Sequence, residues 1–231
     1  MRVLVLGASG ATGRLVVSQL VERNIRVRAL VRPTARVDEQ IREHALVELV
    51  SGLIDDYREQ EIRNLIEGCD AVICCLGHTL SFKGMFGRPR KLVTHAVQRV
   101  TAQLHASQKF ILMSTTAYTD GSRGEKNSRG ESIIFSLLKV VLPPHRDNML
   151  AADHLVHEIG ETLPWVAVRP DSLVEDEQVT GYEVFEHRQR SPMFNPGKAS
   201  RINTAHFMAE LVQDDGLWEQ WKQRMPVLYT T

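Results

Sequence analysis

The stretch that decides the fold spans residues 2–33 and reads RVLVLGASGATGRLVVSQLVERNIRVRALVRP. The apolar run at 3–6 leads into three glycines at three-residue spacing, and an amphipathic segment and a second apolar run follow. This order predicts a strand, a tight turn, a helix and a second, parallel strand. It is the pattern with which a dinucleotide-binding βαβ unit begins.

Each glycine of this turn has its own expected role. Gly7 permits the sharp exit from the strand, Gly10 lets the backbone approach a pyrophosphate, and Gly13 lets the helix pack closely on the strand. Backbone amides at the helix start then bind the phosphates. The predicted cofactor-binding residues of this loop are Gly7, Ser9, Gly10, Ala11, Thr12, Gly13 and Arg14. A glycine-rich turn of another α/β protein is the alternative.

The end of the second predicted strand indicates which dinucleotide is preferred. An acidic residue at this position binds the ribose hydroxyls of NAD. This chain has Arg32 there, and Arg14 follows the third glycine. Either arginine alone is typical of a solvated surface charge, but two beside the adenosine ribose favour the 2′-phosphate of NADP(H) over NAD(H).

Apolar runs and amphipathic segments continue to alternate along the chain. Strands are expected at 3–6, 27–31, 45–50, 71–76, 110–113 and 165–168. Helices are expected at 13–22, 57–67, 91–107, 148–160 and 204–214. Strands that are apolar on both faces, each followed by a helix, predict an α/β fold with a doubly wound parallel sheet, which is Rossmann-like.

The domain organisation follows from the absence of a linker. We expect residues 1–231 to form a single NAD(P)-binding domain, with a small C-terminal, substrate-side lobe within 171–231. The carboxyl ends of the strands should form the ligand crevice. By this topology Asp55 or Ile54 lies near the adenine, and Leu76 and Gly77 lie on the adenosine side.

Composition excludes several classes of partner. Lys and Arg together number 28, as do Asp and Glu, so no net charge draws the chain to nucleic acid or to a membrane. Three cysteines, two of them adjacent, indicate reduced thiols and a cytoplasmic location. The spacing of Cys74, Cys75 and His78 does not suit a zinc site, so no metal is expected. We expect a small-molecule substrate, and a homodimer is left open.

The chain resembles the atypical short-chain dehydrogenase/reductases, in their NAD(P)H-binding, NmrA-like branch. The motifs that carry the resemblance are VLVLGASGATGR, LVRP, CCLG, FILMSTTA, LPWVAVRPDSL and SRINTAHFMAELVQD. They follow the order of that branch over nearly the whole chain, and they are similar to the biliverdin-IX-beta/flavin reductase type. The resemblance implies that Ser114, Thr115 and Pro170 border the nicotinamide end of the cofactor.

One feature of the wider superfamily is missing. Alcohol-oxidising members use a tyrosine followed four residues later by a lysine, which lowers the pKa of the phenol. None of the four tyrosines of this chain has such a lysine. Substitute proton donors are Tyr118, His145 and His154, each of which also has a structural interpretation. The catalytic candidates are therefore Thr115, Tyr118 and His145.

These observations leave three functional hypotheses. The preferred one is an NADP(H)-dependent oxidoreductase that reduces a flavin, a quinone or a similar conjugated acceptor, because such reductions can proceed without the tyrosine–lysine pair. The alternative is a non-catalytic NADP(H)-binding redox sensor. A sugar-nucleotide epimerase relative is a weaker alternative, because epimerases of this fold need the pair.

Two later segments complete the sequence prediction. Residues 119–144 form an insertion whose polar first half is expected to be a mobile lid. Its apolar second half is expected to be a helix packed on the domain's own surface, a lid or a subunit contact being the alternatives. Trp218 and Trp221 are three apart, which predicts that they share one face of a helix.

Overall fold

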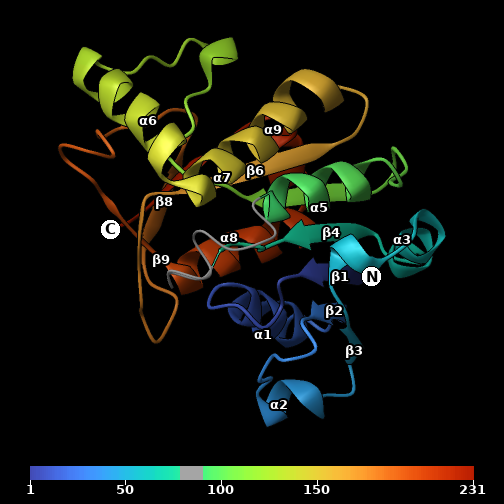
Figure 1. Ribbon diagram of the computed structural model, residues 1–231. Coiled ribbons are helices and arrows are strands. Elements are labelled where there is room, and N and C mark those ends of the chain that lie inside the picture. The colour runs from blue at the N-terminus through green and yellow to red at the C-terminus, as the bar shows by residue number, and fades with distance from the viewer. Residues whose placement is uncertain (79–90) are drawn as a thin grey trace.

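The computed structural model describes residues 1–78 and 91–231 of the chain. Within these residues the main sheet has eight strands in the order β3-β2-β1-β4-β5-β6-β10-β8 (Figure 1). The strands are β1 (Arg2–Leu6), β2 (Arg26–Val31), β3 (Val47–Ser51), β4 (Ala71–Cys74), β5 (Lys109–Met113), β6 (Trp165–Pro170), β8 (Tyr182–Phe185) and β10 (Val227–Thr230). Neighbouring strands are parallel except β8, which is antiparallel to β10. The predicted doubly wound α/β fold is confirmed.

Helices cover both faces of this sheet. One layer contains α1 (Gly13–Glu22), α8 (Arg201–Gln213) and α9 (Asp215–Trp221), and the other contains α3 (Glu59–Ile66), α5 (Leu92–Thr101) and α7 (Pro143–Asp153). In Figure 1, α5 and α7 lie above the sheet and α1 lies below it. Val3 and Val5 of β1 belong to the core on the α1 side, whereas Leu4 and Leu6 belong to the core on the α5 side. Because side chains alternate along a strand, its continuous apolar run serves both layers.

The helix predicted at 148–160 begins earlier than expected. Helix α7 begins at Pro143, because a proline lacks an N–H and fits the first turn, where that N–H would have no partner within the helix. It continues beyond Asp153 as a π-helical segment, His154–Ile159. The remaining short elements are α2 (Glu39–Arg42) and the 3₁₀ turns Ile54–Asp56 and Gly121–Arg123.

Residues 171–231, predicted to include a small substrate-side lobe, also complete the main sheet and one helical layer. Strand β10 lies between β6 and β8, and α8 packs along α1, where Arg23 forms an ion pair with Glu210 at 2.6 Å. Only β7 (Ser172–Val174) and β9 (Lys198–Ser200) pair outside the main sheet among the described strands. Trp218 and Trp221 are both buried on α9, so the predicted helix is confirmed.

A buried ion pair anchors the first half of the insertion, the part that the sequence predicts to be a mobile lid. The Arg169 guanidinium, which is fully buried, donates to both carboxylate oxygens of Glu125, at 2.6 and 3.0 Å. Glu125 also accepts hydrogen bonds from the backbone N–H groups of Asp120 and Arg188. Burial alone would raise the pKa of Glu125, but the hydrogen bonds and charge of Arg169 outweigh it and lower that pKa. The expected lid motion therefore has to break a buried, bidentate contact.

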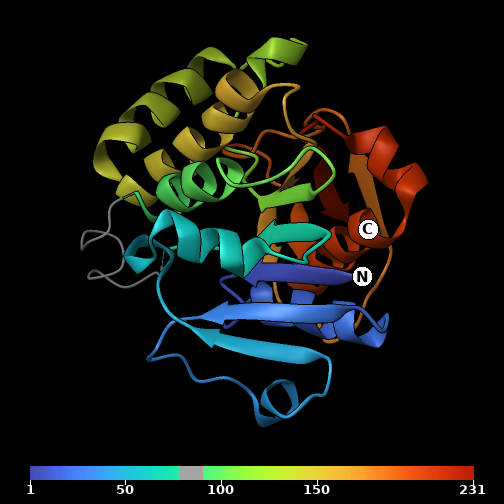
Figure 2. The same cartoon turned by 90° about the vertical axis from the view of Figure 1, so that its right-hand side faces the viewer.

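The second half of the insertion forms α6 (Arg129–Val141), which begins with a capping box between Ser128 and Glu131. It packs on α7 and lies outside it, at the periphery of the molecule (Figure 2). Its inner side buries Phe135, but the outer side leaves Ile133 71% exposed and Leu137 61% exposed. The predicted packing on the protein's own surface therefore accounts for one side of α6 only, and the other side is exposed to solvent.

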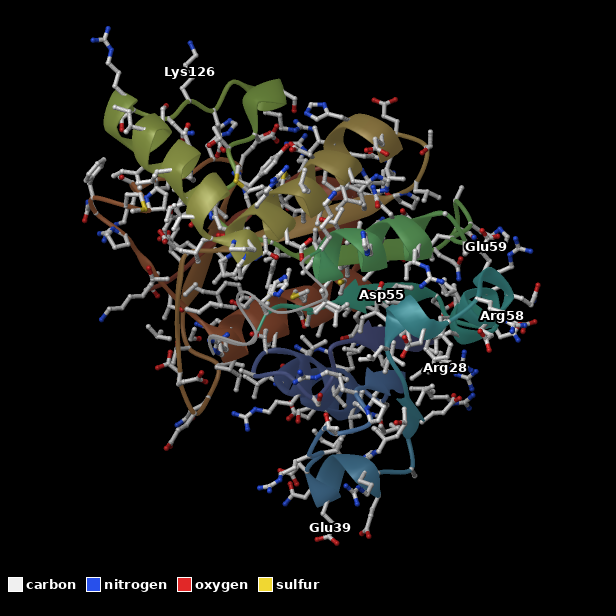
Figure 3. All side chains as sticks on the ribbon, viewed as in Figure 1. Arg28, Glu39, Asp55, Arg58, Glu59 and Lys126 are labelled. Carbon is white, nitrogen blue, oxygen red and sulfur yellow. The ribbon has the colours of Figure 1, made fainter. Side chains whose placement is uncertain are left out.

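The ion pair yields a test of stability. Replacing Glu125 by alanine should lower the free energy of unfolding in urea by about 3–5 kcal/mol, because it leaves the buried Arg169 charge unpaired. The matched control is Glu59→Ala, whose partner Arg63 lies 3.8 Å away on an exposed helix face, and which should cost under about 1 kcal/mol (Figure 3). Equal losses of unfolding free energy for the two variants would contradict a stabilising role of the buried Glu125–Arg169 pair.

The same pair predicts a pH dependence. The pKa of Glu125 is lower in the folded protein than in the unfolded chain. The contribution of Glu125 to stability is therefore present above the ordinary carboxyl pKa of about 4.3, and it is lost as the pH falls through the folded-state pKa of Glu125. The difference between the parent protein and Glu125→Ala should shrink over that acidic range.

Candidate functional site

Two positions of the turn after β1, Gly7 and Gly13, have no room for a side chain. Gly7 has a φ of +76°, and a Cβ there would lie 2.8 Å from the carbonyl oxygen of Cys75. A Cβ on Gly13 would lie 2.2 Å from the carbonyl oxygen of Gly7. The Gly10 N–H donates to that same oxygen at 2.9 Å, which closes the turn. The backbone thus passes from strand to helix in the geometry that a phosphate-binding loop needs.

A cavity opens to solvent beside this turn, at the carboxyl ends of β1, β2 and β4, and its empty space together with its open mouth is about 580 Å³. It is lined by Gly7, Ser9, Gly10, Leu30, Arg32, Gly52, Leu53, Ile54, Cys75, Leu76, Gly77 and Leu92. The predicted residues Gly7, Ser9, Gly10, Arg32, Leu76 and Gly77 are therefore brought together. The other walls are mainly apolar, as suits the flat face of an adenine ring.

Seven predicted cofactor residues are not in the lining of this cavity: Asp55, Ala11, Arg14, Thr12, Gly13, Ser114 and Pro170. Asp55 is not part of its lining, although its neighbour Ile54 is, and the Asp55 carboxylate lies 3.9 Å from the His95 ring (Figure 3). Ala11 and Arg14 line an adjoining hollow. That hollow also contains Arg36, which the sequence reasoning missed and which the short loop after Arg32 brings back toward Arg14.

Thr12 and Gly13 are buried beneath the turn instead of facing the cavity. The Thr12 hydroxyl accepts a hydrogen bond from the Arg201 guanidinium at 3.2 Å, so the start of α1 is tied to the start of α8. Thr12 and Gly13 shape the loop through packing, whereas Ser9 and Gly10 line the cavity.

The ends of β5 and β6 carry the residues predicted near the nicotinamide. The Ser114 N–H donates to the Val168 carbonyl at 2.7 Å, which joins the two strand ends. The Ser114 hydroxyl is buried and has no hydrogen-bond partner in the described structure. Thr115 follows it and accepts from the Ala117 N–H at 3.2 Å, and Pro170 closes β6. A buried hydroxyl without a partner is costly unless a ligand satisfies it, so this end fits a bound polar group.

Each candidate proton donor makes a defined packing contact. Tyr118 is buried and donates to the Asp153 carboxylate at 3.0 Å, and burial together with that charge raises its pKa. The His145 ring stacks on Phe135 of α6, with centroids 5.8 Å apart. His154 is buried with its Nε2 3.2 Å from the Thr101 hydroxyl. Of the three, Tyr118 is the least suited to exchange a proton, because its hydroxyl is already engaged with a carboxylate.

Sequence reasoning missed Asp147, a fully buried carboxylate on α7. It accepts hydrogen bonds from the N–H groups of Val93 and Thr94 and from the Thr94 hydroxyl, and so caps the start of α5. It also accepts from Nε2 of His78 at 2.8 Å, directly after Gly77 of the cavity wall. An acidic residue within an otherwise buried helix face was the available signal.

The electrostatics of Asp147 favour its ionised form. Burial would raise its pKa, but the hydrogen bonds from His78 and Thr94 outweigh burial and lower it. A charged carboxylate at the start of a helix is also stabilised by the helix dipole. Asp147 therefore fixes α5, α7 and the segment after β4 relative to one another, and α5 and that segment contribute Leu92, Leu76 and Gly77 to the cavity wall.

The metal-ligating and thiol side chains of the described residues are dispersed or buried. Among residues 1–78 and 91–231, no group of three or more His, Cys, Asp or Glu side chains could hold a metal ion. The cysteines are free and buried, and burial raises the pKa of Cys74 to about 12. No helix in the same residues is long and apolar enough to cross a membrane.

The fold and the glycine turn define a dinucleotide-binding α/β protein. Residues 7–215 match the sequence profile of the NAD(P)H-binding family, and the chain belongs to that family. This confirms the resemblance found in the sequence and supports a dinucleotide as the ligand of the cavity.

Solved structures show the same fold over the full length. A proposed NADH-flavin reductase from Streptococcus pneumoniae has a TM-score of 0.70 at 15% identity and covers 100% of both chains. The anaerobillin reductase ChuY from Escherichia coli O157:H7 has a TM-score of 0.68 at 16% identity and covers 100% of this chain and 97% of that one. A short-chain dehydrogenase/reductase from Veillonella parvula in complex with NADP has a TM-score of 0.69 at 14% identity and covers 99% and 94%.

The Asp147 cluster generates a prediction. Asp147→Asn keeps the size of the side chain but removes the charge and one acceptor, so it should lower the free energy of unfolding at neutral pH by about 1.5–3 kcal/mol. Asp56→Asn, at an exposed carboxylate, is the control and should change stability by less than about 0.5 kcal/mol. Because the pKa of Asp147 is lowered, the effect should fade as the pH drops through its folded-state value. An unchanged urea midpoint at neutral pH would show that Asp147 has no such role.

Proposed function

We propose that this protein is an NADP(H)-dependent oxidoreductase that reduces a flavin, a quinone or a related conjugated acceptor. The observation that carries the proposal is the glycine turn, with its cavity at the strand ends and Arg32 in the cavity wall. The names of two structural neighbours, a proposed NADH-flavin reductase and an anaerobillin reductase, support the substrate class. The buried, free cysteines support a cytoplasmic location.

The proposed orientation of the cofactor is based on the residues that line the cavity and the adjoining hollow. The pyrophosphate would lie on the turn of Gly7 and Gly10, and the adenosine would lie against Leu76 and Ile54. Arg32 in the cavity, with Arg14 and Arg36 in the adjoining hollow, supports a preference for the 2′-phosphate of NADP(H). Guanidinium groups bind phosphate through charged hydrogen bonds. The three arginines therefore strongly favour a ribose that carries a 2′-phosphate, and they disfavour an unphosphorylated ribose only weakly.

At the other end of the cofactor, the protein's task is positioning. The bound nicotinamide supplies a hydride to an electron-poor ring. Ser114 offers a buried hydroxyl with no protein partner, and Thr115 borders the same strand end. His145 is the proposed proton donor, because Tyr118 is held by Asp153 and its pKa is raised.

A redox sensor remains the second candidate function. The observation that favours it is the engagement of Tyr118 in the core, together with the absence of a tyrosine–lysine pair. A sensor would bind the cofactor without turnover and would change its affinity for a partner with the cofactor's oxidation state. The two functions therefore differ in one assay.

That assay is NADPH oxidation with FMN, riboflavin and a set of quinones as acceptors, with NADH in parallel. We expect steady, acceptor-dependent loss of the near-ultraviolet absorbance, faster with NADPH. Tight NADPH binding without oxidation by any acceptor would replace the reductase with the sensor. Absence of binding to either cofactor would overturn both.

The cofactor preference has its own test. Arg32→Ala should weaken NADPH binding by about 1–3 kcal/mol, because a charged hydrogen-bond partner of the 2′-phosphate is lost, and should leave NADH nearly unchanged. Cofactor fluorescence titration measures both. Arg42→Ala, at an exposed arginine on α2, is the matched control. Equal losses for the two cofactors would remove the 2′-phosphate role of Arg32.

A further inference from the structure

One line of α6 faces solvent with side chains that normally avoid it. Arg129, Ile133, Leu137 and Val141 are four residues apart, so they share one side of the helix. Ile133 is 71% exposed, Leu137 61% and Val141 52%. We name this set, with Phe194, the α6 face. Contiguous exposed aliphatic side chains on a stable helix mark an interaction surface.

The orientation of α6 is fixed by its other side, so the exposure is a property of the fold. Phe135 is buried and stacks on His145 of α7. Glu131 is buried and accepts a hydrogen bond from the Ser191 hydroxyl at 2.6 Å. Rotating the helix to hide Ile133 would expose Phe135 and break the Glu131 contact. The apolar line therefore remains outside.

A neighbouring loop extends the same surface. Phe194 is 62% exposed, and its ring lies against Gly130, where an added Cβ would be 3.1 Å from the ring. Gly130 precedes the apolar line by one helical turn. The aromatic ring therefore continues the patch from the start of α6 onto the segment after Ser191.

Exposed basic side chains lie at the start of the α6 face. Lys126, Arg129 and Arg190 are exposed around the start of α6, and Lys126 projects outward there (Figure 3). Two carboxylates lie nearby: Glu125 is paired with Arg169, and Glu131, which accepts from the neutral Ser191 hydroxyl, keeps its charge but is buried. A chain with no net charge thus presents a locally basic, apolar surface.

We propose that the α6 face docks on an anionic lipid surface. A helix with an apolar line lies in the plane of the interface with that line in the acyl boundary, and adjacent cations meet the lipid phosphates. Helix α6 has 13 residues and is about 20 Å long, which suits this orientation and is too short to span a bilayer. This contact is peripheral, and it differs from the absence of membrane interaction that the neutral composition predicts.

A second copy of the chain is the competing occupant, and the charges disfavour it. Two α6 faces brought together would place Arg129 and Lys126 of one copy near those of the other, while the nearby carboxylates Glu125 and Glu131 already have hydrogen-bond partners within the fold. Like charges across an interface cost several-fold in affinity, whereas lipid phosphates neutralise them. Charge complementarity therefore selects an anionic surface.

The test is sedimentation of the full-length protein with vesicles. We expect binding to phosphatidylcholine vesicles that contain phosphatidylglycerol to be at least about tenfold stronger than binding to phosphatidylcholine alone, and to weaken with added salt. Ile133→Glu with Leu137→Glu should abolish binding. Arg129→Glu should remove the preference for the anionic vesicles. Val179→Glu, at an exposed apolar residue on another segment, should change neither.

Folding of each variant is checked by its melting temperature and by retention of NADP(H) binding, neither of which depends on vesicles. Equal binding of the parent protein to both vesicle types, or no binding to either, overturns the proposal. It is also overturned if sedimentation velocity shows a dimer that the Ile133→Glu, Leu137→Glu variant converts to a monomer while vesicles are not bound. Because no turnover is measured, the result is independent of the reductase assay.

Discussion

The carbonyl oxygen of Gly7 is crowded from two sides, and the rest of the site depends on that crowding. It accepts the Gly10 N–H at 2.9 Å, and the Gly13 backbone lies so close that a Cβ there would be 2.2 Å away. Helix α1 therefore starts directly under the end of β1, and its direction is fixed relative to the sheet. The contact of α8 with α1 and the position of the cavity both follow from that direction. The cavity is a consequence of close backbone packing more than of any particular side chain.

Two buried charged groups position the segments around the same edge of the sheet. Asp147 joins α7 to the start of α5 and to His78, and Arg169 joins β6 to the insertion through Glu125. Both lie where the strands end, and both are surrounded by hydrogen-bond partners that offset the cost of desolvation. The sheet provides the platform, and these two residues determine how the surrounding loops sit on it. A polar core of this kind favours one arrangement of the loops over its alternatives.

The sequence predicted the fold because its signals are local. The βαβ start, the glycine spacing and the alternation of apolar runs each lie within a few tens of residues, and the structure confirms them. Strand β10 was missed because it is short and follows Pro226, so its identity depends on pairing with β6 and β8. Asp147, Arg36 and the Arg169–Glu125 pair were missed or given other roles because their partners are distant in sequence. Periodicity predicts which face of a helix or strand is buried, but it does not identify the residue that this face contacts.

Arg169 also constrains the order in which the chain can mature. Its guanidinium is enclosed by the Tyr118 and Met225 carbonyls, by Glu125 and by the Glu186 carbonyl. The last of these to leave a ribosome is Met225, which is 56 residues after Arg169. Until that point the end of β6 carries a cation whose shell is incomplete, so water must stay in this part of the nascent core. Folding that proceeds from the N-terminus during synthesis can complete the β3-to-β5 half early, whereas the β6 edge closes only once Met225 has left the ribosome.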